Sequence, residues 1–285
     1  MKDASTVRMT DGSLWKNIFI FSIPLMCSNR LHVLFNMSDM AVDGQFAGTE
    51  ARGAVGSCTT AVSLFTGLLI GMGGGINAIA ARYEGAGDRV RIGKTVHSSL
   101  LISLIYGFSI MVLGLLLIDK LLIVLNTKDE LLTDAILYMR VYLLGTPALA
   151  IYNFGNGILS AAGDSKRPLY YPFAAGMVNI VLNLFFVIAC NLSVMGVALA
   201  SAISQYLSAF LILHRLFTCS TEYALSMHEM RIDGVITKTV LMLGLPTALQ
   251  NAIFAVANLF IQAAVNSFDT LMVEGNSAAA NADAL

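Results

Sequence analysis

Residues 16–56 read KNIFIFSIPLMCSNRLHVLFNMSDMAVDGQFAGTEARGAVG, an apolar stretch that is long enough to cross a bilayer but carries regularly spaced polar residues. A carboxylate at membrane depth is costly, so a polar face here is expected to line a water-filled cavity or meet a polar partner. Helical spacing places six polar side chains on one such face: Ser22, Asn29, His32, Asn36, Asp39 and Asp43. This pattern is typical of a transport site.

Two carboxylates on this face, Asp39 and Asp43, lie four residues apart and would repel each other on a helix. Either one of them holds a proton near neutral pH, or both gather round a cation. Both alternatives predict that this stretch takes part in ion binding.

The composition places the chain in a membrane. Of its 285 residues 56% are hydrophobic and only 12% are charged, and the mean hydropathy is +0.74. A soluble domain usually carries about 25% charged residues. The chain has no basic patch interleaved with aromatics, which argues against nucleic-acid binding. Its four cysteines are scattered, without a CxxC motif, and no nucleophile–base set or metal cluster is apparent. We therefore expect a polytopic membrane protein that is not an enzyme and binds no metal cofactor.

The hydrophobic segments predict an all-α fold, because hydrocarbon offers the backbone no hydrogen-bond partner. A spanning helix needs about 20 mostly apolar residues. Seven segments qualify: 17–42, 54–80, 97–124, 135–161, 168–190, 194–217 and 238–266. The residues that follow, up to Leu285, resemble the start of an eighth.

Lysine and arginine are distributed unevenly among the loops. Segment 82–94 holds four and segment 163–168 holds two, whereas segment 190–194 holds none. Positively charged loops stay on the cytoplasmic side. The sequence therefore predicts a multi-pass protein of the cell membrane whose N-terminus, and the loops after helices 2, 4 and 6, are cytoplasmic.

An internal repeat indicates a second bundle. A shift of 222 residues aligns seven identical residues, including Pro24 with Pro246 and Asn29 with Asn251. Six helices separate the two copies, which gives a parallel repeat. We expect a six-helix N-terminal bundle (1–217), a cytoplasmic linker (218–237) and an incomplete second bundle (238–285) that contains helix 7 and the beginning of helix 8. The chain is then expected to be a truncated product or fragment, or else a half-transporter that dimerises.

Four stretches in order resemble the MATE (multidrug and toxic compound extrusion) transporters. They are FSIPLMCSNRLHVLFNMSDMAVDGQFAGTEARGAVG (21–56), GLLIGMGGGINAIAARYEGAGD (67–88), YNFGNGILSAAGDSKRPLYYP (152–172) and NIVLNLFFVIACNLSVMGVALASAIS (179–204). The resemblance implies twelve helices in two six-helix lobes. It also implies export of organic cations or other drugs in exchange for Na+ or H+.

The resemblance also suggests roles for single residues. Asp39 matches an aspartate implicated in cation coupling, Asn179 matches a polar coupling residue, and Pro24 matches a proline at which the first helix bends. Asn183 stands where many members carry aspartate, and Ser201 where threonine is common. An amide cannot hold a proton, although its oxygen can ligate sodium.

The candidate cation-coupling set is therefore Asp39, Asn179, Asn183, Ser201, Asn36 and Asp43, with Pro24 as a hinge and Na+ or H+ as the coupling ion. Asp39 is the candidate ligand for Na+. Asp43 and His32 depart from the family pattern, where an apolar residue and a glutamine are usual.

Two alternatives remain open beside an exporter of organic cations. One is a lipid-linked saccharide flippase of the related superfamily, which would need more internal arginine and lysine than the scarcely charged helices supply. The other is a degenerate membrane protein that only binds partners, consistent with the replacement of the expected acid by Asn183.

Overall fold

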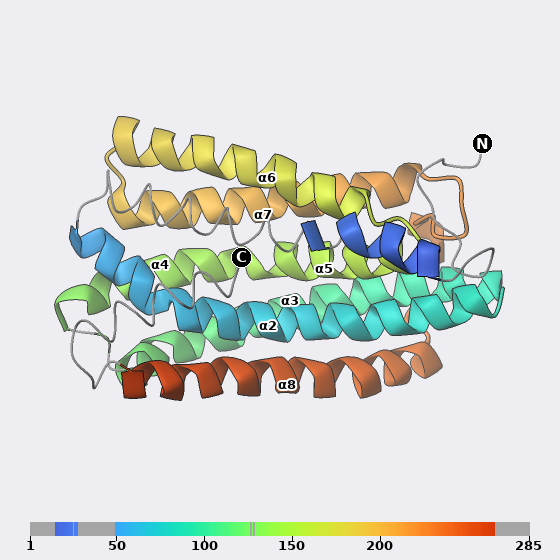
Figure 1. The fold of residues 1–285 in the computed structure, drawn as a ribbon, viewed down its shortest axis with the longest axis horizontal. Coiled ribbons are helices and arrows are strands. Elements are labelled where there is room, and N and C mark those ends of the chain that lie inside the picture. Colours follow the sequence, from blue (N-terminus) through green and yellow to red (C-terminus); the bar gives the residue numbers. More distant parts are fainter. Residues whose placement is uncertain (1–14, 25, 28–48, 126, 128, 266–285) are drawn as a thin grey trace.

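The computed structural model of the chain describes residues 15–24, 26–27, 49–125, 127 and 129–265. Within these ranges the chain is an all-helical bundle whose long helices run along one common axis (Figure 1). The helices are α2 (Thr49–Gly85), α3 (Arg89–Val124), α4 (Asp129–Leu144), α5 (Thr146–Ala161), α6 (Arg167–Leu184), α7 (Ser193–Thr218) and α8 (Gly234–Val265). Five are long and apolar enough to span a membrane, and the bent pair α4–α5 makes a sixth span. The expected all-α membrane fold is confirmed.

The first predicted helix, 17–42, is described only in part. Residues 15–24 and 26–27 are helical, and Pro24 is half-buried near the end of this segment. Asn36, Asp39 and Asp43 lie outside the described residues, so their proposed roles stay predictions.

The fourth predicted helix, 135–161, is divided at Gly145 into α4 and α5, which meet at an angle of 46°. Pro147 in the first turn of α5 has no N–H to continue the ladder of α4. The hydroxyl of Thr146 instead donates to the carbonyl of Leu143 at 2.7 Å. A continuous helix was the wrong expectation here, because a proline two residues after a glycine ends one helix and starts the next.

The helix α2 is the central element, with α5 and α8 packed against it. Glycines make both contacts close. A Cβ atom on Gly73 would lie 3.1 Å from the Asn153 side chain of α5, and one on Gly75 would lie 2.6 Å from the Gly244 backbone of α8. Without side chains between them, the backbones approach to van der Waals distance, as is common for membrane helices.

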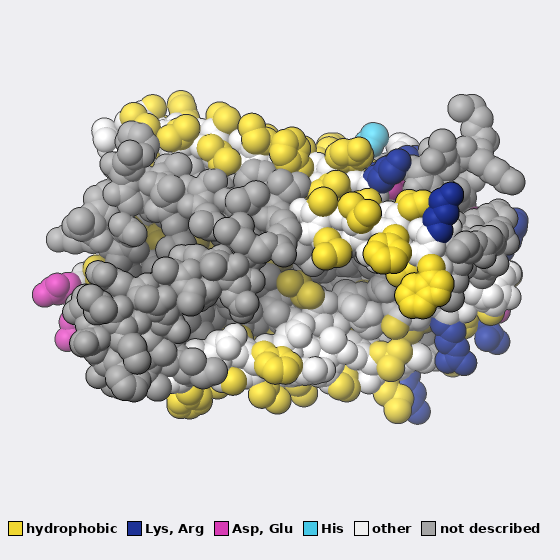
Figure 2. All heavy atoms as spheres, viewed as in Figure 1, with side chains coloured by type: hydrophobic (Ala, Val, Ile, Leu, Met, Phe, Trp, Pro, Cys, Tyr) yellow, Lys and Arg dark blue, Asp and Glu magenta, His cyan; other side chains and the backbone are white. Residues whose placement is uncertain are grey.

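Charged residues lie mainly at the two ends of the bundle. On the face shown in Figure 2, lysine and arginine gather at one end, and the acidic side chains that stand out most clearly lie at the other. The basic end holds the α2–α3 turn with Arg82 and Arg89, the start of α6 with Arg167, and the connection between α7 and α8. The opposite end holds the start of α4, with Asp129 and Glu130 in its first turn. The sides between the two ends are mostly apolar.

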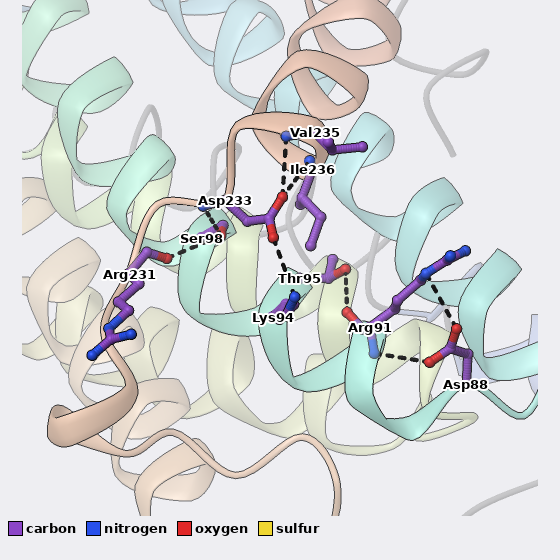
Figure 3. Close-up of polar contacts among 9 residues, drawn as sticks. All are labelled: Asp88, Arg91, Lys94, Thr95, Ser98, Arg231, Asp233, Val235 and Ile236. Carbon is purple, nitrogen blue, oxygen red and sulfur yellow. Dashed lines mark hydrogen bonds and ion pairs between the residues drawn. The ribbon is translucent and has the colours of Figure 1, made fainter.

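The connection between α7 and α8, residues 219–233, returns along the first turns of α3 and ends in a capped helix start. The carboxylate of Asp233 accepts hydrogen bonds from the backbone N–H groups of Val235 at 3.0 Å and Ile236 at 3.2 Å (Figure 3). Lys94 of α3 pairs with the same carboxylate at 3.6 Å. These contacts fix where α8 begins.

The first prediction concerns the contact between α2 and α8. Gly75→Ala should destabilise the protein by about 1–3 kcal/mol, because the new methyl group meets backbone and forces the helices apart. Gly74→Ala is the matched control: its methyl would come no closer than 4.0 Å to Thr247, and alanine favours helix over glycine. Thermal unfolding in detergent measures both. A Gly75→Ala protein as stable as Gly74→Ala would contradict the close approach.

The second prediction concerns the start of α8. The N–H of Ile236, aided by that of Val235 and by Lys94, holds the pKa of Asp233 below its ordinary value. The cap should therefore hold above the ordinary carboxyl pKa and be lost as the pH falls through the lowered value. Hydrogen exchange of the Val235 and Ile236 amides should accelerate over that window. Asp233→Asn keeps an acceptor oxygen but cannot titrate, so equal acid sensitivity in this variant would refute the assignment.

Candidate functional site

Two buried asparagines lie on the inward face of α6. This face presents Pro168, Ala175, Gly176, Asn179 and Asn183, which recur at helical spacing, while Phe173, Met177 and Val181 face outward. Asn179 is 5% exposed and Asn183 is fully buried. The side-chain amide of Asn183 donates through Nδ2 to the side-chain oxygen Oδ1 of Asn179 at 3.2 Å. Two amides paired one turn apart in the interior of an apolar span form a neutral site rich in oxygen and nitrogen.

Ser201 of α7 lies at the same depth as the asparagine pair. α6 and α7 are adjacent and antiparallel, and Gly196 is packed against Phe186. With a rise of 1.5 Å per residue, Ser201 is about 7.5 Å from this contact along α7. Asn183 and Asn179 are about 4.5 and 10.5 Å from it along α6. The structure thus brings Ser201 to the level between the two asparagines.

A second polar group surrounds the break between α4 and α5. The hydroxyl of Tyr142 is 3.1 Å from that of Thr66 on α2, and its ring stacks on Tyr138 with centroids 6.1 Å apart. Gln205 of α7 lies beside the same Tyr142. Its carboxamide also fills the place that a Cβ atom of Gly145 would occupy.

Gln205 connects the two polar groups because it lies one helical turn after Ser201 on α7, so both project from the same side of that helix. α7 packs against α6 and also against α4. Uncharged polar groups therefore occur on three neighbouring helices of the described bundle: Asn179 and Asn183 on α6, Ser201 and Gln205 on α7, and Tyr142 on α4. None of these side chains is ionised at neutral pH.

The sequence alone did not identify Tyr142, Thr66 or Gln205 as members of a site. A tyrosine, a threonine and a glutamine in three apolar helices carry no motif, because their meeting depends on the bend at Gly145. The described residues contain no group of three or more His, Cys, Asp or Glu that could hold a metal ion. Asp39, the predicted charged member of the site, lies outside these residues.

Comparison with known proteins identifies the family. The family model MatE matches residues 24–185. A "Probable multidrug resistance protein YpnP" of Bacillus subtilis is 28% identical over 283 residues, which cover 97% of this chain and 62% of that protein. An "FAD transporter" of Shewanella oneidensis is 25% identical over 87% of this chain and 56% of its own length.

A solved structure of a MOP superfamily transporter from Pyrococcus furiosus superposes with a TM-score of 0.88 at 29% identity, over 98% of this chain and 62% of that one. The chain thus spans about three fifths of the length of the proteins it matches. The family-model match covers more than half of the chain and includes the asparagine pair of α6. The chain belongs to the MATE family of membrane transporters.

Proposed function

We propose that this chain forms part of a secondary transporter that exports organic cations or drug-like molecules in exchange for Na+ or H+. The observation that carries the proposal is the buried pair Asn179–Asn183 in an otherwise apolar span of a MATE protein. Polar groups at membrane depth are expensive and mark ion or substrate pathways. Multidrug relatives support a drug-like substrate class.

In this proposal the described residues supply neutral ligands and Asp39 supplies the charge. Amide and hydroxyl oxygens are acceptors for Na+, and these groups neither gain nor lose a proton in this pH range. Asn179, Asn183 and Ser201 would therefore bind and orient the ion, while protonation or cation binding would take place at Asp39. Asn36 and Asp43, on the same predicted face as Asp39, would complete the set.

The proposed topology places the basic end of the bundle in the cytoplasm. Figure 2 shows lysine and arginine concentrated there, which agrees with the positive-inside rule. The N-terminus would then be cytoplasmic and the protein would lie in the cell membrane.

A complete transport path is proposed to need further helices. Only about 17% of the most apolar part of α8 is buried in the described structure, and Met242, Leu249 and Ile253 are exposed. Transporters built from repeats hold substrate between the two bundles. The second bundle would come from a longer chain or from a second copy of this one.

The third prediction tests the function itself. Cells that lack their own exporters would express this chain or its Asp39→Asn variant, and efflux of a fluorescent organic cation would be followed under an imposed Na+ or H+ gradient. We expect the variant to lose about tenfold or more in rate, since interactions with a charged group contribute about 1.5–3 kcal/mol. Asp129→Asn, an exposed acid in the first turn of α4, is the matched control and should export normally.

Three outcomes of this experiment are informative. Equal efflux by the Asp39→Asn variant would exclude Asp39 as the coupling residue. No efflux from any form that reaches the membrane would contradict transport by this chain alone, and the second bundle of the proposed transporter would then have to come from a longer chain. Inhibition by added FAD but not by organic cations would favour an anionic substrate like that named for the Shewanella relative.

The fourth prediction tests whether Asn183 belongs to the ion site. Asn183→Asp introduces a carboxyl that is charged at high pH and neutral at low pH, so Na+-driven efflux should change with pH more steeply than in the unmodified chain. Asn183→Ser is the control, because it keeps an oxygen ligand without a titratable group and should preserve the original pH profile. Superimposable profiles for the aspartate variant and the unmodified chain would exclude Asn183 from the site.

A further inference from the structure

The connection between α7 and α8, here called the strap (residues 219–233), is held along the basic end of the bundle by side chains of α2 and α3. Arg89 pairs with Glu222 at 2.9 Å, and Tyr223 donates to Glu84 at 2.6 Å. Burial, and then this bond to a carboxylate, raise the pKa of Tyr223, so the phenol remains a donor.

Ser98 of α3 holds the last turn of the strap by acting both as a hydrogen-bond donor and as an acceptor. Its hydroxyl donates to the carbonyl of Arg231 at 3.0 Å and accepts from the N–H of Asp233 at 2.9 Å (Figure 3). Lys94, one turn earlier, pairs with Asp233. None of these bonds requires a group that changes protonation near neutral pH.

His97, beside Ser98, makes a contact of a different kind. Its side chain is almost completely buried, at 2% exposure. Nδ1 lies 2.7 Å from the carbonyl oxygen of Gly93, and Nε2 lies 2.9 Å from the backbone nitrogen of Ser226 in the strap. A carbonyl can only accept and an N–H can only donate, so Nδ1 must carry the proton and Nε2 must be bare. Only the neutral imidazole, in this one tautomer, satisfies both contacts.

A proton added to Nε2 would face the N–H of Ser226 and remove the bond between them. The site can receive a proton because a pocket of about 890 Å³, between the start of α3 and the strap, includes His97 in its wall. The charged or titratable groups that line this pocket with the imidazole come from two elements: Arg89 and Lys94 of α3, and Glu222, His228, Glu229, Arg231 and Asp233 of the strap. Among them, Glu222 and Asp233 are already paired with Arg89 and Lys94.

We propose that His97 is a protonation-sensitive latch: its neutral imidazole ties the strap to α3, and protonation of Nε2 releases Ser226. Histidine is the side chain whose charge normally changes between about pH 5 and 8. Ser98 and Lys94 stay bound to the end of the strap when the latch opens, so release is local. His97 is therefore a positioning residue for the strap around Ser226, while Ser98 and Lys94 hold its end at Asp233, where α8 starts.

The expected magnitude follows from proton linkage. An imidazole in water titrates near pH 6.5. If the latched state excludes the proton, the ratio of latched to open strap is then about tenfold lower at about pH 5.5 than at about pH 8. Acid therefore opens the latch and alkali closes it.

The fifth prediction is measured on the 285-residue chain in lipid nanodiscs, by hydrogen exchange of the strap corrected for intrinsic rates. Protection of the Ser226 amide should fall about tenfold from about pH 8 to about pH 5.5. In His97→Gln the carboxamide oxygen can accept the same bond but cannot titrate, so protection should be equal at both pH values. In His97→Leu it should be low at both.

Two controls distinguish the latch from general loosening. Ser98→Ala should lower protection of the Asp233 amide at both pH values while keeping the tenfold change at Ser226. His228→Gln should keep that change too, because His228 makes no part of the latch. Nitrogen-15 NMR of the unmodified chain supplies a readout that needs no variant: at about pH 8 His97 should be the neutral Nδ1–H tautomer. The proposal is overturned by a different tautomer, by pH-independent protection of Ser226, or by an unaltered pH response in His97→Gln.

Discussion

Every polar group in the spanning part of this chain must find its partner inside the protein, because hydrocarbon offers none. Many hydroxyl side chains meet this constraint locally by donating to a carbonyl one turn earlier in the same helix, as Ser109 does to Ile105 and Thr239 does to Val235. Such residues need no neighbour and carry no information about function. The paired amides of Asn179 and Asn183 differ, because they are buried between helices where smaller apolar residues would pack at lower cost.

The same constraint explains where irregular backbone occurs. α2 contains 37 residues and is therefore about 55 Å long, well beyond a hydrocarbon core of about 30 Å. Its end and the start of α3 extend past the apolar zone, and the strap packs against them there. Backbone groups that a helix would satisfy are satisfied instead by Ser98 and His97. At mid-depth the break at Gly145 is compensated by Thr146, whose hydroxyl bonds to the preceding turn.

Much of the fold could be predicted from sequence, because hydrophobic segments of spanning length leave few alternatives in a membrane. The ranges predicted for α7 and α8 agree with the structure to within about four residues, and the range predicted for α6 runs six residues past Leu184, through the short π-helix η2 (Phe185–Ala189). The break at Gly145 was missed because the segment around it remains apolar on both sides. In the candidate site, Asn179 and Asn183 are four residues apart, so the sequence predicts that they share one face of the helix. Their position inside the predicted span 168–190 predicts their depth in the membrane.

The contacts of Tyr142 with Thr66 and Gln205 could not be predicted, since they depend on which helices become neighbours. His97 was missed for the same reason: its partner, the backbone of Ser226, lies 129 residues away. Residues 28–48, which hold the predicted acidic face, remain a sequence-based prediction.

The glycine contact between α2 and α8 has a mechanical consequence. Long side chains at a helix interface can change rotamer and keep contact while the helices slide or separate. Here Gly75 faces the backbone of Gly244, and Gly71 faces that of Ala248, so no flexible layer exists to stretch. Dispersion attraction falls by a quarter to a half over a gap of about 0.5–1 Å. A small separation of α2 and α8 therefore loses much of the attraction, and no other contact compensates for the loss. Intermediate separations are then unfavourable, so the two helices are expected to be either in full contact or apart.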